Sequence, residues 1–109
     1  MIITNKESSI GIIDIRKIII NELNKHNDYI CFYDVSFKDG SHRISDDGNT
    51  LFDIDPDLKE PTKEIVEILK RYGLCCENRE IFTFVEKDEL ESKEKEFEKA
   101  LTEINNLYK

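Results

Sequence analysis

The sequence predicts an α+β fold, in which a small antiparallel sheet is covered by two C-terminal helices. Apolar residues alternate with period two from Tyr29 to Phe37, and an Asp-Gly turn and a second short strand follow. Two helical patterns with one apolar face occupy residues 61–72 and 88–108. No repeat, low-complexity tract or linker divides the chain. Residues 1–109 are therefore expected to form a single domain, with a loose N-terminus at residues 1–9.

The composition argues against two classes of partner. The chain has 109 residues, of which 39% are apolar and 37% charged, and its formal net charge is −8. A chain of this length buries enough surface to form a core without disulfides or metals. Nucleic-acid backbones and anionic membranes bind surfaces that carry surplus Lys and Arg. The acidic balance therefore argues against nucleic acid and membranes as direct partners.

We expect a cytoplasmic protein that needs no cofactor. The chain contains no apolar run long enough to span a membrane, and its first residues lack the basic and apolar regions of a signal peptide. Its three cysteines, Cys31, Cys75 and Cys76, form an odd set without paired spacing, which is typical of free thiols in a reducing compartment. The adjacent Cys75 and Cys76 lack an accompanying Cys-x-x-Cys, so free thiols are favoured over a metal or redox site.

The stretch from Ile10 to Leu23 fits two secondary structures. Its residues Ile12, Ile15, Ile19 and Leu23 share one face of a helix, which Ser8 or Ser9 would cap. The same stretch is rich in isoleucine, whose β-branched side chain favours strands. Periodicity alone does not distinguish helix from strand here.

The next segments predict a hairpin. Residues 29–37 alternate between two faces, as a strand requires. Lys38-Asp39-Gly40-Ser41 then supplies an Asp-Gly turn, and residues 42–45 return as the partner strand. A second turn is predicted at Asp46-Asp47-Gly48-Asn49.

The first predicted helix has a start and a stop signal. Pro61 is expected at its first position, and Gly73 is expected to end it with an apolar contact from Leu74. A pair at i and i+4, Glu67 and Arg71, supports the exposed face. The apolar face consists of Ile65, Ile68, Leu69 and Tyr72.

A short strand at residues 81–85 precedes the last predicted helix. Asp88 is expected to cap that helix, with Glu91 completing a capping box. The pairs Glu89–Lys93 and Glu91–Lys95 support its outer face. Its buried face is expected to consist of Leu90, Phe97, Leu101, Ile104 and Tyr108.

Two short motifs resemble a known family. His26-Asn27-Asp28, followed by the strand Tyr29-Ile30-Cys31-Phe32-Tyr33, and the later run Ile44-Ser45-Asp46-Asp47-Gly48-Asn49-Thr50 resemble the bacterial and phage family called domain of unknown function 1828. The likeness continues through Tyr72-Gly73-Leu74, the strand at 81–85 and the last helix, where it includes Ala100, Leu101, Asn106 and Leu107. It covers most of residues 18–108, although Asn21-Glu22-Leu23 stands where the family has Thr-Pro-Phe. The resemblance implies a strand at Ile18–Ile20 and a gene carried by prophages or mobile elements, and it implies no activity.

Aspartates near these motifs suggest a metal-dependent hydrolase or nuclease as one hypothesis. Asp28, Asp46 and Asp47, with Asp53, His26 and His42 near them in sequence, offer oxygen and imidazole ligands for Mg²⁺ or Mn²⁺. Ordinary turn chemistry explains the same residues, because Asp accepts local backbone N–H bonds and Gly adopts positive φ. Since the spacing matches no metal motif, turn chemistry is the favoured interpretation and no cofactor is expected.

The charge pattern suggests a protein-binding function instead. Five aspartates, and no Lys or Arg, lie between Ser45 and Asp57. Such a strip would bind a basic protein partner, for example a nucleic-acid-binding enzyme of the host whose DNA groove the acidic surface mimics and blocks. A solvated surface that keeps the protein soluble accounts for the same charge. The residues expected to bind a partner are Asp46, Asp47, Asp53, Asp55 and Asp57.

Self-association is a third hypothesis. Aromatic side chains are frequent in the region of the predicted sheet, and one sheet face would remain for a second copy of the chain. A sheet covered on one side by the two helices accounts for the same residues. The aromatic residues concerned are Tyr29, Phe32, Tyr33, Phe37 and Phe52.

Overall fold

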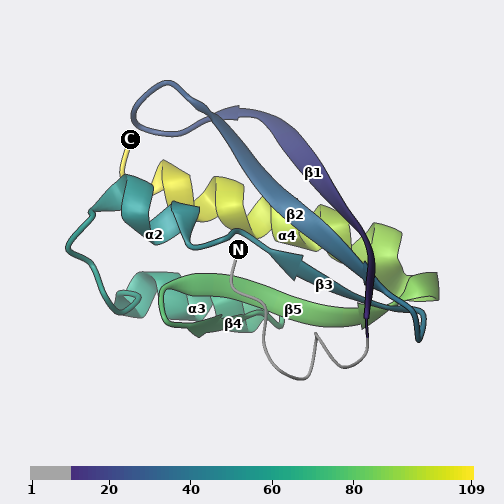
Figure 1. Cartoon of the computed structure of the whole chain (residues 1–109). Coiled ribbons are helices and arrows are strands. Elements are labelled where there is room, and N and C mark those ends of the chain that lie inside the picture. Colours follow the sequence, from purple (N-terminus) through teal and green to yellow (C-terminus); the bar gives the residue numbers. More distant parts are fainter. Residues whose placement is uncertain (1–10) are drawn as a thin grey trace.

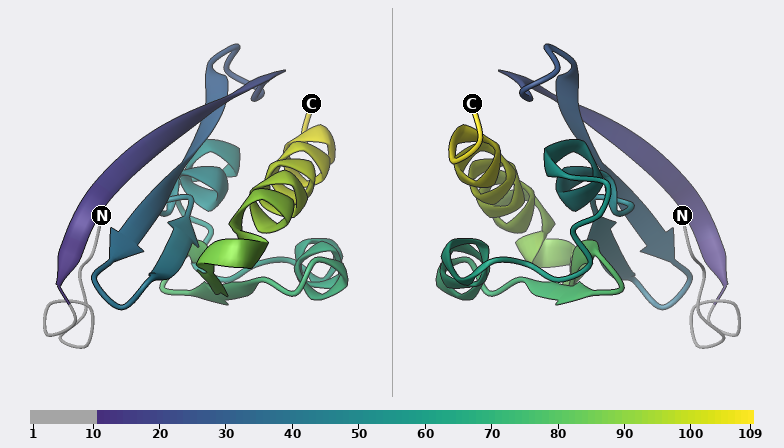
Figure 2. Two further views of the ribbon diagram at one scale, coloured as in Figure 1. Left: turned by 90° about the vertical axis from the view of Figure 1, so that its right-hand side faces the viewer. Right: turned by 90° about the vertical axis from the view of Figure 1, so that its left-hand side faces the viewer.

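The computed structural model describes residues 11–109, and it confirms the α+β class. Five antiparallel strands form one sheet in the order β1-β2-β3-β5-β4 (Figure 1). The helices lie on one side of this sheet, which bends around them (Figure 2). The loose N-terminus expected at 1–9 lies outside the described residues. The elements are β1 (Ile12–Leu23), β2 (Tyr29–Phe37), β3 (Ser41–Ser45), α2 (Asn49–Ile54), α3 (Lys63–Arg71), β4 (Cys75–Glu77), β5 (Glu80–Glu86), the 3₁₀ turn η1 (Lys87–Glu89) and α4 (Leu90–Asn106).

The isoleucine-rich segment is a strand rather than a helix. It forms β1, an edge strand that pairs antiparallel with β2 and places Ile18 opposite Phe32 and Ile19 opposite Cys31. Isoleucine fits this pleated, half-buried position because its branched Cβ restricts the side chain little in a strand. The strand that the family resemblance implies at Ile18–Ile20 is therefore confirmed.

The β2–β3 hairpin matches the prediction. β2 spans residues 29–37 as expected, and the Asp-Gly turn follows, with Gly40 at φ 88°. The Asp39 side chain accepts the Ser41 N–H at 2.9 Å, which is ordinary turn chemistry. The predicted strand at 81–85 is also confirmed as β5, which pairs with β3.

β4, the three-residue strand at one edge of the sheet, was not predicted from the sequence. β4 and β5 form a tight hairpin whose two turn residues, Asn78 and Arg79, have φ values of 51° and 69°. Two positive φ values define the primed turn that suits a hairpin, but such turns are recognised in a sequence by Asn-Gly or Asp-Gly. Because Arg79 stands where a glycine is usual, the sequence did not indicate a turn here.

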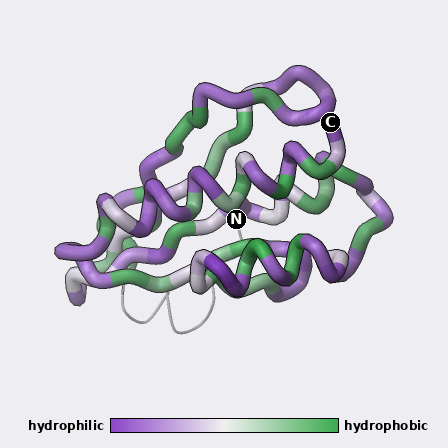
Figure 3. Tube along the Cα trace, turned by 180° about the vertical axis from the view of Figure 1, so that it is seen from behind, coloured by the Kyte–Doolittle hydropathy of each residue, from purple (hydrophilic) through white to green (hydrophobic). Residues whose placement is uncertain are grey.

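The core lies between the sheet and the helices. Phe32 of β2 and Phe97 of α4 are fully buried, and their ring centroids lie 5.0 Å apart. Apolar and polar residues alternate along the helices, as expected of helices with one buried face (Figure 3). No helix in residues 11–109 is long and apolar enough to cross a membrane. The other apolar side chains of residues 11–109 with no exposed surface are Ile44, Leu51, Ile65, Ile81, Ala100, Leu101 and Ile104.

Helix α3 ends as predicted but begins two residues later than Pro61. Thr62 is the N-cap, and its hydroxyl accepts the Ile65 N–H at 3.3 Å, so the proline lies before the cap. Gly73, at φ 66°, ends the helix: Leu74 N–H donates to the Leu69 carbonyl at 2.9 Å and Gly73 N–H to the Lys70 carbonyl at 3.2 Å. These two bonds form a Schellman motif, and Leu74 is buried as that motif favours.

The predicted cap of α4 is wrong. Asp88 lies in the 3₁₀ turn η1, and no side-chain cap bond is made at the start of either η1 or α4. Lys93 donates to the Tyr72 carbonyl at 2.8 Å and to Glu96 at 3.1 Å, instead of pairing with Glu89. The side chain thereby joins α4 to the end of α3, a contact that the sequence of one helix does not reveal. The buried face of α4 contains Phe97, Leu101 and Ile104 as expected.

Of the other two predicted helical pairs, one is confirmed. Glu91 and Lys95 lie 3.6 Å apart on the exposed face of α4. Arg71 contacts Glu103 of α4 at 2.7 Å, and not Glu67 of its own helix. A long charged side chain can reach several opposite charges, so the packing of α3 against α4 determines which ion pair Arg71 forms.

A third helix, α2, was not predicted, and a buried carboxylate holds its start. Asp46 has no exposed surface. One of its oxygens accepts the N–H groups of Gly48 at 2.8 Å and Ile81 at 2.9 Å, and the other accepts the N–H of Thr50 at 3.1 Å. Asp46 therefore joins the end of β3, the start of α2 and the start of β5. The six-residue α2 has no other side-chain cap, because Gly48 precedes it.

Burial opposes the charge of this carboxylate. Desolvation raises the pKa of Asp46 from 3.8 to about 6, and the hydrogen bonds from Ile81, Thr50 and Gly48 oppose the shift. The Asp46 carboxylate therefore binds a proton more readily in the folded protein than in the unfolded chain.

Replacing Gly73 should destabilise the fold through backbone conformation. A residue with a Cβ is disfavoured by about 1–2 kcal/mol at the positive φ of Gly73. Gly73→Ala should lower the free energy of unfolding by about this amount, measured by urea denaturation. Gly73→Asn is the matched comparison and should lose less, because Asn tolerates the left-handed region. Equal stability of wild type and Gly73→Ala would contradict the assignment of the Schellman motif.

The stability of the wild type should fall with rising pH through Asp46. Because its pKa is raised on folding, Asp46 stabilises the fold fully below pH 3.8, and this contribution is lost as the pH passes about 6. Relative to Asp46→Asn, the free energy of unfolding should decrease by roughly 3 kcal/mol between acid and neutral pH, at 1.36 kcal/mol per pKa unit. Urea titrations of both proteins across this range measure the difference. A constant offset between the two proteins would refute the prediction.

Candidate partner-binding surface and pocket

The two sequence motifs meet at α2. The loop between β1 and β2, residues 24–28, lies against the C-terminal end of this helix. Asn24 Nδ2 donates to Asp53 Oδ2 at 3.2 Å, and His26 Nε2 lies 2.8 Å from the Asp53 carbonyl oxygen. The Lys25 ammonium donates to the Ile54 carbonyl. Asp46 holds the start of α2, and this loop holds its end.

Within the loop, Asn24 is the organising residue. It is buried, and its Oδ1 accepts the N–H groups of His26 at 2.8 Å and Asp28 at 3.1 Å. Asn27 completes the bend at φ 64°, a conformation that Asn adopts more readily than most residues. His26, expected as a metal ligand under the hydrolase hypothesis, is exposed and bonded to the helix end.

A pocket of about 220 Å³ opens between loop 24–28, α2 and the last turns of α4. Its polar wall combines carboxylate, amide and hydroxyl groups from segments far apart in the sequence. Tyr29 and Cys31 of β2 contribute a less polar side. The lining residues are Asn24, Asp28, Tyr29, Ile30, Cys31, Asn49, Thr50, Asp53 and Asn105.

Two carboxylates give the pocket its negative charge. Desolvation raises the pKa of Asp53, the hydrogen bond from Asn24 and the nearby His26 lower it, and the neighbouring Asp28 carboxylate raises it. Asp28 and Asp53 therefore repel each other across the pocket. None of the residues that line it is a Lys or Arg. A positively charged ligand would relieve this repulsion.

The structure divides the aspartates that were expected to bind a partner. Asp46 is fully buried and bonded to backbone N–H groups, so it offers no surface to a partner. Asp47 is half-buried in the turn before α2, and Asp53 is half-buried at the pocket. Asp55 and Asp57 are exposed in the loop after α2. Four of the five residues therefore remain on the surface around one short helix.

The alternative metal set is not brought together. Asp28 lies in the pocket with Asp53, whereas Asp46 is turned into the interior and Asp47 lines a different hollow. Within residues 11–109 there is no group of three His, Cys, Asp or Glu side chains that could hold a metal ion. Asp46 thus follows the favoured interpretation, turn chemistry.

An exposed aromatic residue stands on α2 among these acids. Phe52 is 53% exposed, and it lines a second hollow of about 400 Å³ together with Asp47 and Arg79. Phe52 was expected among the aromatic residues of the sheet region, and that expectation is wrong. Phe32 is buried under α4, Phe37 is buried, and Phe52 belongs to a helix. Because Leu51 and Ile54 of the same helix are buried, no local pattern in the sequence indicated that Phe52 would be exposed.

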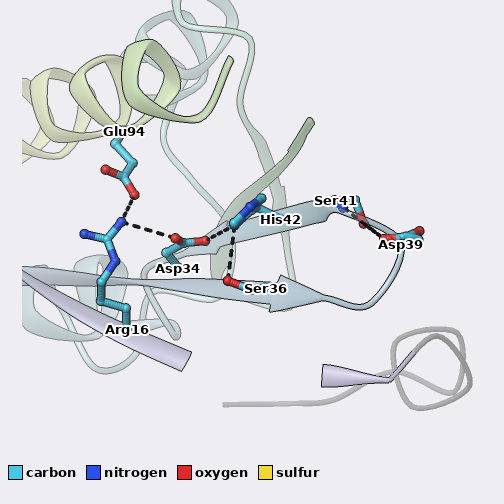
Figure 4. Close-up of polar contacts among 7 residues, drawn as sticks. All are labelled: Arg16, Asp34, Ser36, Asp39, Ser41, His42 and Glu94. Atoms are coloured by element: carbon cyan, nitrogen blue, oxygen red, sulfur yellow. Dashed lines mark hydrogen bonds and ion pairs between the residues drawn. The ribbon is translucent and has the colours of Figure 1, made fainter. Parts of the chain in front are cut away.

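A separate polar cluster joins β1, β2, β3 and α4 (Figure 4). Asp34 is buried; it accepts from Arg16 at 3.2 Å and lies 2.8 Å from His42 Nδ1. Arg16 also pairs with Glu94 of α4. The hydrogen bond with Asp34 raises the pKa of Arg16, and desolvation raises the pKa of Glu94. The cluster attaches the start of α4 to the sheet.

This cluster does not have the geometry of a hydrolytic triad. Ser36 Oγ lies 3.4 Å from His42 Nδ1, the same ring nitrogen that contacts Asp34. In a triad, the nucleophile and the carboxylate contact opposite nitrogens of the imidazole ring. His42 could not take a proton from Ser36 while Asp34 orients it. The arrangement is that of a buried structural network.

The comparisons with known proteins agree with the motifs. A family model described as "Domain of unknown function DUF1828" matches residues 23–104, which include loop 24–28, α2 and nearly all of α4. No curated protein and no solved structure shows a significant match to the chain. The match covers well over half of the 109 residues. The chain therefore belongs to the DUF1828 family.

Proposed function

We propose that this chain is a small, acidic, non-enzymatic binding protein whose partner surface is α2 and the loop that follows it. The observation that carries the proposal is Phe52, a 53% exposed aromatic side chain on a helix surrounded by acids. The partner is a protein with a basic surface. The acids concerned are Asp47, Asp53, Asp55 and Asp57, and Phe52 together with these four residues is called the α2 surface below.

The α2 surface has the composition of an interface. Aromatic residues near the centre of an interface contribute most of its binding energy, and the charged residues around them steer the partner and set its orientation. Phe52 supplies such an anchor, and the aspartates supply a charged rim. The net charge of −8 adds long-range attraction for a basic partner.

The surface is also held in place before binding. Asp46 fixes the start of α2, and Asn24, Lys25 and His26 fix its end. A surface that is already ordered loses less conformational entropy when it binds. This supports recognition by α2 itself rather than by a segment that folds on its partner.

The sharpest form of the proposal is inhibition of a host defence or nucleic-acid enzyme. Clustered carboxylates repeat, on a protein, the close spacing of negative charges along duplex DNA. A basic groove that binds DNA would accept such a surface and lose access to its substrate. The phage and mobile-element setting implied by the family resemblance supports this target class, since a small inhibitor serves an invading element directly.

Affinity capture from a bacterial lysate tests the proposal. The immobilised wild type should retain a basic protein at low salt and release it at about 0.5 M salt, where exposed charges are screened within a few ångströms. The triple variant Asp53→Asn/Asp55→Asn/Asp57→Asn and the single variant Phe52→Ser should both retain much less of it, as quantified by mass spectrometry.

A matched variant separates the α2 surface from overall charge. Glu64→Gln/Glu67→Gln/Glu98→Gln removes the same charge from exposed positions on α3 and α4, and it should retain the partner like wild type. If the captured protein is a nuclease, adding wild type should inhibit it and added salt should restore its activity. Equal retention by all baits, or retention of no basic protein by wild type, would refute the proposal.

A further inference from the structure

We infer that the pocket between loop 24–28, α2 and α4 binds the guanidinium group of an arginine on the partner protein. The inference rests on the proposed function, because it names the group by which the partner of the α2 surface is recognised. The pocket adjoins that surface, and the two share Asp53.

The first observation is that the side-chain oxygen of Asn105 accepts no hydrogen bond from residues 11–109. Asn105 of α4 is 4% exposed, and its Nδ2 donates to the Leu101 carbonyl at 2.8 Å. That bond fixes the orientation of the amide, so Oδ1 is the atom left over. It has no hydrogen-bond partner among residues 11–109, yet it is not sealed in the interior, and Asn105 lines the pocket. Such an oxygen can accept a hydrogen bond from a ligand in the pocket.

The second step is the charge of the pocket. Asp28 and Asp53 both line it, and no lysine or arginine does. The Asn24 amide donates a hydrogen bond to Asp53. The side chain of Asp28 accepts no hydrogen bond from the described part of the chain. The pocket therefore presents carboxylate and amide oxygens and carries surplus negative charge. The complementary ligand is a cation with several N–H donors.

The third step favours guanidinium over a metal ion. Only two carboxylates line the pocket, and residues 11–109 hold no group of three metal-ligating side chains. A volume of about 220 Å³ exceeds the need of a single ion and suits one long side chain. The planar guanidinium carries five donors, matches carboxylates and stacks on aromatic rings. The pocket lining supplies these two carboxylates together with amide and hydroxyl groups, to which such donors can bind.

Titration with N-acetyl-arginine methylamide, followed by NMR of the ¹⁵N-labelled chain, tests the inference. The Asn105 side-chain amide signals should shift and saturate, because the probe donates to Oδ1. Asp28→Asn should lower the affinity for the probe by roughly tenfold, as expected for loss of a charge-assisted hydrogen bond. The folded state should survive this change, since only the backbone of Asp28 is bonded within the described residues.

Two controls isolate the pocket. Glu67→Gln removes the same charge from an exposed residue of α3 outside the pocket, and it should bind the probe within about twofold of wild type, since salt screens an exposed charge that does not line the pocket. N-acetyl-citrulline methylamide has the shape of the arginine probe without its charge, and it should cause no saturating shift. An unmoved Asn105 signal, equal binding of the citrulline probe or equal weakening of probe binding by Glu67→Gln would overturn the inference. Saturation of the same signals by Mn²⁺ in place of arginine would overturn it as well and assign a metal site.

The outcome is distinguishable from that of the proposed function. If the arginine probe binds and no basic protein is captured, the pocket stands and the proposed function fails. If a partner is captured through the α2 surface and the probe leaves Asn105 unmoved, the pocket assignment alone fails. Where both hold, capture by Asp28→Asn should be weaker than capture by Glu67→Gln.

Discussion

The hydrogen bonds of the buried Asp46 carboxylate are the interaction on which the proposed binding face of this protein depends. A six-residue helix that follows a glycine has little stability of its own, since short helices need external partners for their free N–H groups. Asp46 supplies those partners and simultaneously extends the pairing between β3 and β5. Without it, α2 would have no defined position against the sheet, and neither the pocket nor Phe52 would be held in place.

Loop 24–28 performs the same task at the other end of α2. Asn24 shapes the loop and reaches Asp53, while His26 and Lys25 meet the last carbonyls of the helix. Much of the sequence that resembles the family thus builds architecture instead of performing chemistry. Asp28 is the exception, because its side chain faces the pocket and is not used by the fold.

The two polar clusters of the molecule differ in how completely their groups are paired. In the cluster of Arg16, Asp34, His42 and Glu94, each member has a partner within the cluster, so it stabilises the contact of α4 with the sheet. The pocket keeps an open amide oxygen and two neighbouring carboxylates. These unused acceptors and the unneutralised charge are the reason why we propose that the pocket and the α2 surface bind a partner.

The sequence by itself determined the elements whose signals are local. Alternation predicted β2, a short run of β-favouring residues predicted β5, Asp39-Gly40 predicted the hairpin turn, and Gly73 predicted the end of α3, because each signal rests on preferences of adjacent residues. Where local preferences conflicted, as in β1, pairing with β2 decided for the strand. The turn at Asn78 and Arg79 carried no recognised signal, and Asp88, which was expected to cap α4, lies in a 3₁₀ turn instead.

The candidate site, in contrast, depends on contacts between residues that are far apart in the sequence. That aspartates near Gly48 matter was readable from the sequence, but their separation into a buried Asp46 and exposed neighbours was not. Nor could the sequence bring Asp28, Asp53 and Asn105 to one pocket, because residues so far apart along the chain meet only once the sheet and α4 have packed. Local preferences determined the elements, and long-range burial, which acts between elements, decided which polar groups were used by the fold and which were left for a partner.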